Sequence, residues 1–121
     1  AAALRAGSTV VVFPEGSTWC GTEAGMFRPA LFQAALDAGV PVRPVAVRYL
    51  TRHGAALHPT TVAAFVGEDT LFASLRRVTA ARGLVAEVTV LPPLSVRDHT
   101  CRRALARAAH GSVMTGAADN R

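Results

Sequence analysis

The chain has 121 residues, half of them hydrophobic and 17% charged, which suits one α/β domain that buries roughly two thirds of its unfolded surface. Its 13 basic residues are all arginine against 8 acidic residues, so the net charge of +5 favours anionic partners without identifying them. Two isolated cysteines argue against a disulfide-stapled secreted domain and favour a reducing compartment. Every apolar run is far shorter than the roughly 20 residues that span a bilayer, so no membrane-spanning segment is expected in this chain.

The first half of the chain predicts a strand, a loop and a helix. Ser8–Phe13 is a β-branched run closed by Pro14 and Gly16, which is typical of a buried parallel strand that ends in a turn. A loop is expected over Gly16–Gly25. Pro29 then suits a first helical position and Gly39 a C-terminal cap. The apolar stripe of this helix would be Leu31, Phe32, Ala35 and Leu36.

The second half predicts strands at Val45–Tyr49, Thr61–Val66 and Val85–Leu91. A helix is expected from Asp69 or Thr70 to Arg82, ended by Gly83. Its apolar face would be Leu71, Leu75 and Val78. A last helix begins near Val96, with Cys101, Ala104, Leu105 and Ala108 on one face, and residues from about 112 to 121 are expected to form a frayed tail.

Strands alternating with helices predict an α/β fold with a mainly parallel sheet flanked by helices. Residues 1–121 are expected to belong to a single domain. The opening Ala1–Gly7 has no initiator methionine and looks like a helix interrupted partway. The chain is therefore interpreted as the C-terminal part of that domain.

Phe13-Pro14-Glu15-Gly16 is the segment that points to chemistry. In open parallel sheets the ligand crevice lies outside the carboxyl ends of the strands, where this segment is predicted to lie. Pro14 would fix the turn, Gly16 would let a ligand approach the backbone, and Glu15 could orient a substrate hydroxyl or hold an arginine. An ordinary solvated turn has the same local sequence.

The segment resembles a motif of the 1-acylglycerol-3-phosphate acyltransferase family, the glycerolipid acyltransferases. Phe13-Pro14-Glu15-Gly16-Ser17 is similar to the family's Phe-Pro-Glu-Gly-Thr, and Phe27-Arg28 to its downstream Phe-Lys. Residues 40–47, Val-Pro-Val-Arg-Pro-Val-Ala-Val, are similar to the next family block. Order and spacing both agree.

The resemblance implies a partial glycerolipid-acyltransferase-like fold and transfer of a fatty acyl group from acyl-CoA or acyl carrier protein to a lysophosphatidate-like hydroxyl. It also implies phospholipid biosynthesis and peripheral contact with the cytoplasmic side of the membrane, without a cofactor, metal or nucleic acid. In the family a histidine acts as general base, with an aspartate five positions later. None of the four histidines, His53, His58, His99 and His110, has that aspartate. The chain alone is therefore expected to be inactive and to contain no catalytic residue.

By the same resemblance, the acceptor-binding residues are Phe13, Pro14, Glu15, Gly16, Ser17, Thr18 and Arg28. Many family members have arginine where this chain has Thr18, so Arg28, or else Arg43 or Arg48, would supply the positive charge. Trp19 could contact an acyl chain or serve as a packing anchor. Cys20 has no neighbouring base, which favours a structural role.

Two other interpretations remain open. The arginines on Leu71–Arg82 and Val96–Ala109 could form a basic surface for nucleic acid or an anionic membrane, although no aromatic stacking platform accompanies them. Alternatively, the chain could be a relative that binds glycerophosphate without acylating it.

Overall fold

The computed structural model describes residues 1–16, 25–64 and 70–118. The chain divides into two compact units: the first contains residues 1–16, 26–46 and 89–121, and the second contains residues 17–25 and 47–88. Each unit is described by itself.

The first unit opens with a short helix, α1 (Ala2–Arg5), and residues 8–13 after it have no regular secondary structure. The prediction of a buried strand over Ser8–Phe13 is wrong: Val11 is 77% exposed and Phe13 is 85% exposed. A β-branched run becomes a strand only where a neighbouring backbone pairs with it. No backbone hydrogen bond ties residues 9–13 to another described segment.

The helix predicted after Pro29 is confirmed. It starts as a 3₁₀ turn, η1 (Pro29–Phe32), and continues as α2 (Gln33–Ala38). Gly39 ends it in the left-handed conformation at φ 67°, where glycine avoids a Cβ clash. Phe32 and Ala35 of the predicted stripe are buried, whereas Leu31 is exposed.

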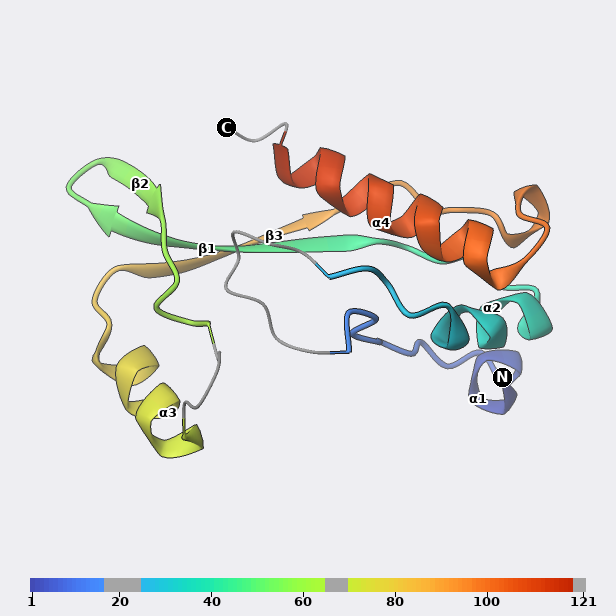
Figure 1. Ribbon diagram of the computed structural model, residues 1–121, viewed down its shortest axis with the longest axis horizontal. Helices are drawn as coiled ribbons and strands as arrows, with labels where there is room; N and C mark the ends of the chain where they lie inside the picture. The colour runs from blue at the N-terminus through green and yellow to red at the C-terminus, as the bar shows by residue number, and fades with distance from the viewer. Residues whose placement is uncertain (17–24, 65–69, 119–121) are drawn as a thin grey trace. The chain divides into compact units, whose positions relative to one another are not determined.

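The last part of the first unit supplies its core. A 3₁₀ turn, η2 (Val96–Asp98), precedes α4 (Arg102–Ala118), which packs against η1 (Figure 1). Phe32 of η1 and Leu105, Ala106 and Ala109 of α4 form the buried cluster. The single helix predicted from Val96 is therefore two elements. Residues 112–118, predicted as a frayed tail, instead continue α4.

The strands are antiparallel. They are β1 (Val45–His53), β2 (Ala56–Pro59) and β3 (Leu84–Val90), in the order β2-β1-β3. β1 pairs with β2 in register from Leu50↔Pro59 to His53↔Ala56. Arg52 N–H donates to Gly83 O at 2.8 Å and Leu91 N–H to Pro44 O at 3.0 Å, so β3 also runs against β1. The division between the units falls within β1 and β3.

The α/β class predicted from the sequence is confirmed, but the mainly parallel sheet is not supported in the described residues. A short hairpin joins β1 to β2, and such a connection requires antiparallel strands. The strands at Val45–Tyr49 and Val85–Leu91 are confirmed with shifted ends. The strand at Thr61–Val66 is wrong over residues 61–64, which form a turn after β2.

In the second unit, α3 (Leu71–Ala80) confirms the predicted helix, and Thr70 caps it by accepting a hydrogen bond from Ala73 N–H at 3.2 Å. Its predicted apolar face is largely uncovered, since Leu71 is 68% exposed and Leu75 54%. No helix in the described ranges combines the length and apolarity that crossing a bilayer would need.

Candidate functional site

The candidate site lies in the first unit, where the Pro14–Gly16 turn meets the segment before η1. Arg28 N–H donates to Pro14 O at 2.8 Å and joins the two segments. Gly16 has φ 68°. A Cβ built on Gly16 would overlap Nε of Arg28 and lie 2.7 Å from its Cζ. The Arg28 side chain therefore lies directly against the Gly16 backbone, which only glycine permits.

Phe27 anchors this arrangement to the core. Its ring stacks on Phe32 with a centroid separation of 6.2 Å and meets the His110 ring edge-on at 5.1 Å. Aromatic pairs at these separations contribute about 0.5–1.5 kcal/mol beyond burial. Because Phe27 is fixed by η1 and α4, the adjacent Arg28 is held beside the turn.

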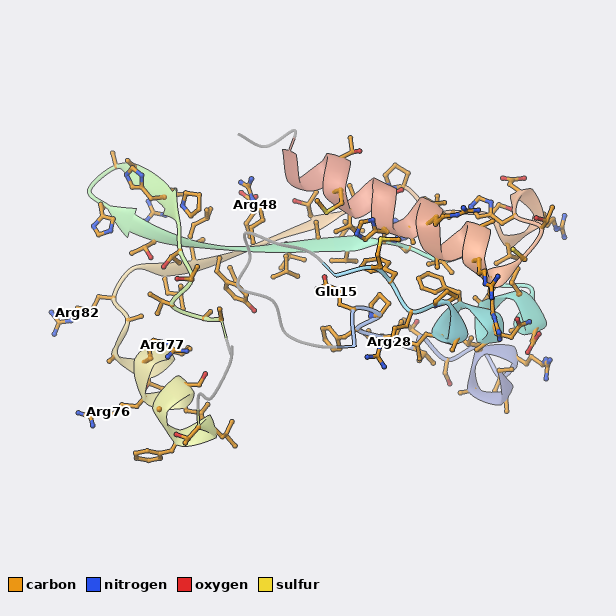
Figure 2. The ribbon with its side chains drawn as sticks, viewed as in Figure 1. Glu15, Arg28, Arg48, Arg76, Arg77 and Arg82 are labelled. Atoms are coloured by element: carbon orange, nitrogen blue, oxygen red, sulfur yellow. The ribbon has the colours of Figure 1, made fainter. Side chains whose placement is uncertain are left out.

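Glu15 occupies the centre of the turn and is half-buried. Figure 2 shows Glu15 and Arg28 on adjacent segments of the first unit. No ion pair joins them in the described structure, so a carboxylate and a guanidinium are both available to a ligand. One group accepts and the other donates, which matches an acceptor with a hydroxyl and an anionic oxygen.

The strand end predicted beneath this turn is absent in the structure, because residues 8–13 form no strand. Phe13 points largely to solvent. Pro14, Glu15, Gly16 and Arg28 are brought together. Ser17 and Thr18, with Trp19 and Cys20, lie outside the described residues.

The other two arginines proposed for the positive charge have different surroundings. Arg43 is exposed. Arg48 on β1 forms an ion pair with Glu87 on β3, with Nη2 3.0 Å from Oε1 and a second hydrogen bond from Nε at 3.1 Å. Arg48 therefore has a structural role in the sheet, and Arg28 remains the cation beside the turn.

The arginines on and just after α3 differ in the direction of their side chains and in their hydrogen bonds. Arg76 and Arg82 project outward, whereas Arg77 turns inward (Figure 2). Arg77 donates from Nε to Val62 O at 2.9 Å and from Nη2 to Ala64 O at 2.6 Å. Arg77 thus holds the turn after β2, and the basic surface expected on this helix is smaller than the sequence indicates.

No hydrogen bond or ion pair joins a histidine to a carboxylate among the described residues. His53 and His58 face each other on the β1–β2 hairpin, with ring centroids 5.9 Å apart. His99 and His110 each have a buried Nε2 without a hydrogen-bond partner among the described residues. No group of three potential metal ligands occurs in the described part of the chain.

A pocket of about 390 Å³ beside Phe27 was not predicted from the sequence. Met26, Phe27 and Pro29 form one wall. The other wall consists of Cys101 and of three residues in the first two turns of α4, Arg103, Ala106 and Arg107. The contributing segments are about 75 residues apart in the sequence, and no short motif links them.

Cys101 lies at the rim of this pocket and precedes α4. Its carbonyl accepts from Leu105 N–H at 3.1 Å, as an N-cap residue does. Hydrogen bonds from the backbone N–H groups of Ala104 and Arg103 lower the pKa of the exposed Cys101 thiol, and Thr100 and the charge of Arg107 act in the same direction.

Comparisons with known proteins place these features in a family context. The family model described as Acyltransferase matches residues 1–48, which contain the turn, Arg28 and the start of β1. The chain is 34% identical over 110 residues to the lyso-ornithine lipid O-acyltransferase of Pseudomonas aeruginosa, covering 91% of this chain and 41% of that protein. The Brucella abortus protein of the same name is 34% identical over 119 residues, covering 91% and 45%.

A shorter match involves a different acceptor. The 1-acyl-sn-glycerol-3-phosphate acyltransferase of Neisseria gonorrhoeae is 45% identical over 51 residues, covering 42% of this chain and 20% of that protein. The chain thus spans less than half the length of the curated relatives that it matches. No solved structure matches it.

Proposed function

We propose, from the premise that this chain belongs to the glycerolipid acyltransferase family, that the protein carrying it transfers a fatty acyl group from a thioester to a lysolipid hydroxyl. The observation that carries this proposal is the contact of Arg28 with Gly16, beside the half-buried Glu15. Both halves of that contact lie within the segment that the acyltransferase model matches.

In this proposal the turn holds the acceptor. Glu15 accepts a hydrogen bond from an acceptor hydroxyl or amine, and Arg28 donates to an anionic oxygen of the headgroup. Gly16, which has no Cβ, lets the Arg28 side chain lie against the turn. Ser17 and Thr18 are included among the proposed acceptor-binding residues on the family resemblance alone.

Deprotonation of the attacking hydroxyl requires a general base. The family places an aspartate five residues after its catalytic histidine, and no histidine of this chain has one. We therefore propose that the base comes from outside these 121 residues and that the chain alone does not turn over. The thioester donor, acyl-CoA or acyl carrier protein, and contact with the cytoplasmic face of the membrane are part of the same proposal.

We propose a lyso-ornithine lipid as the acceptor in preference to lysophosphatidate. The two relatives aligned over 91% of this chain are named for the former, whereas the relative named for the glycerophosphate aligns over 42%. Thr18 also replaces the arginine that many family members have after the turn. Without that arginine, the segment would bind a phosphate less tightly, which suits a headgroup that has no phosphate. In such a headgroup Arg28 would bind a carboxylate.

The test is an acyl-transfer assay on membranes from cells that produce the full-length protein, with acyl-CoA and each acceptor in turn. Product with lyso-ornithine lipid at a kcat/KM at least about tenfold above that with lysophosphatidate supports the proposal. Glu15→Gln and Arg28→Gln should each lower activity, while the exposed control Arg43→Gln should not. Absence of product with every lysolipid, or full activity in Glu15→Gln, would overturn it.

A further inference from the structure

The pocket between the start of η1 and α4 combines an apolar wall with two cations. Met26, Phe27, Pro29 and Ala106 supply carbon surface. Met26 is 66% exposed, which leaves apolar area for a ligand to cover. The volume of the pocket, about 390 Å³, falls within the range of small-molecule pockets, roughly 300–1,000 Å³.

The cations are Arg103 and Arg107, which are four residues apart and thus share one face of α4. Like charges at this spacing destabilise a helix. Both residues are exposed, and the described residues offer neither of them an acidic partner. An anion between the two guanidinium groups would remove their repulsion and accept hydrogen bonds from both.

From these features we infer that the pocket binds a single-chain amphiphile whose head carries an anionic oxygen group, a carboxylate or a phosphate. The chain lies against Met26, Phe27 and Ala106, and the head lies at Arg103 and Arg107. A polar head alone would leave the apolar wall uncovered, and an alkyl chain alone would leave the guanidinium repulsion unrelieved.

This site differs from the turn that holds Glu15. Arg28 lies between Met26–Phe27 and Pro29 in the sequence, but its side chain lies against Gly16 and does not line the pocket. Binding at Arg103 and Arg107 can therefore be measured without turnover. Its outcome does not depend on the proposed acyl transfer.

Cys101 provides the readout, because its exposed thiol lines the pocket. The 121-residue chain is treated with iodoacetamide, and the alkylation rate of the peptide containing Cys101 is followed by mass spectrometry. Dodecyl phosphate and N-dodecanoylglycine, both below their micelle concentrations, should slow that rate about fivefold or more at saturation. Dodecyltrimethylammonium, inorganic phosphate and acetate should leave it unchanged, since each lacks either the anionic head or the alkyl chain.

The matched variants remove equal charge. Arg103→Gln with Arg107→Gln should weaken half-maximal protection at least about tenfold, because two charged hydrogen bonds are lost. Arg97→Gln with Arg102→Gln, at exposed positions that do not line the pocket, should leave it unchanged. Each rate is normalised to the same variant without ligand, and circular dichroism confirms that α4 is intact. Met26→Gln should weaken protection by shortening the apolar wall.

Three results would overturn the inference. Equal protection in both double variants would show that the pocket arginines do not bind the head. Equal protection by inorganic phosphate would show a simple ion site. Protection by phosphatidylglycerol vesicles but by neither soluble amphiphile would show adsorption to a charged surface.

Discussion

The side chain of Arg28 lies against Gly16, and the amide of Arg28 holds the carbonyl of Pro14 at 2.8 Å. Side chain and backbone of one residue thus fix a turn that lies 12 residues earlier in the sequence. The conformation of Gly16, at φ 68°, and the position of the guanidinium depend on each other.

Replacing Gly16 with alanine should displace Arg28 as well as strain the turn. Left-handed backbone costs an alanine about 1 kcal/mol, and the new Cβ would overlap Arg28 Nε, so the side chain would have to move. We expect KM for the lysolipid to rise about tenfold or more, because small misplacements of binding groups are costly. Steady-state kinetics of the full-length protein measure this.

Gly39→Ala is the matched control for that substitution. Gly39 has φ 67°, nearly the same as Gly16, yet nothing lies within 4 Å of the position that its Cβ would take. Both variants should lose about 1 kcal/mol in urea unfolding, but only Gly16→Ala should change KM. Equal KM effects would show that backbone strain, and not Arg28, is responsible.

Leu105→Ala should destabilise the fold strongly. Leu105 is fully buried in the cluster that joins η1 to α4. Cavity formation on replacing such a leucine costs about 2–5 kcal/mol, a large part of the stability of a small domain. Urea unfolding followed by circular dichroism should show it. Leu75→Ala, at a 54% exposed position on α3, should change stability by less than about 0.5 kcal/mol.

The Arg48–Glu87 pair should contribute modestly to the sheet. Both side chains are partly exposed, at 24% and 33%, so solvent screens the charges and the coupling should be below about 1 kcal/mol. A double-mutant cycle with Arg48→Met and Glu87→Gln measures it, and the coupling should shrink in about 1 M salt. If salt leaves the coupling energy unchanged, the coupling comes from packing of the aliphatic side-chain carbons of Arg48 and not from its charge.

Alkylation of Cys101 should remain fast at pH values below the range in which an ordinary cysteine thiol ionises. Its folded pKa is lowered, chiefly by the backbone N–H groups of Ala104 and Arg103, so the thiolate is present above that lowered value. The rate should fall as pH drops through the folded pKa. In Arg107→Gln the midpoint should move up in pH, because one favourable charge is removed. The denatured chain provides the reference midpoint.

Local signals in the sequence predicted the helix from Pro29 to Gly39, since a proline start and a glycine cap act within a few residues. The same holds for Thr70, whose side chain caps α3. The strand at Ser8–Phe13 failed because pairing depends on a neighbour that local composition does not specify. The parallel sheet failed because it rested on the alternation of elements, and the short β1–β2 hairpin was not recognised.

At the candidate site, the resemblance identified Glu15, Gly16 and Arg28, but only the structure shows that Arg28 lies against Gly16. The pocket at Arg103 and Arg107 could not be predicted, because it requires knowing that Phe27 packs between η1 and α4.

The uncovered run from Val10 to Phe13 has a consequence for the behaviour of the chain in concentrated solution. Together with Ser8 and Thr9 it makes a six-residue segment without a charge or proline, which is the length and composition of segments that form cross-β stacks between molecules. Fibril growth should therefore start at this segment and show a lag phase that shortens with protein concentration. Val11→Lys, at the 77% exposed position, should suppress fibril growth because it adds a charge to the segment, and it should leave the buried core unchanged.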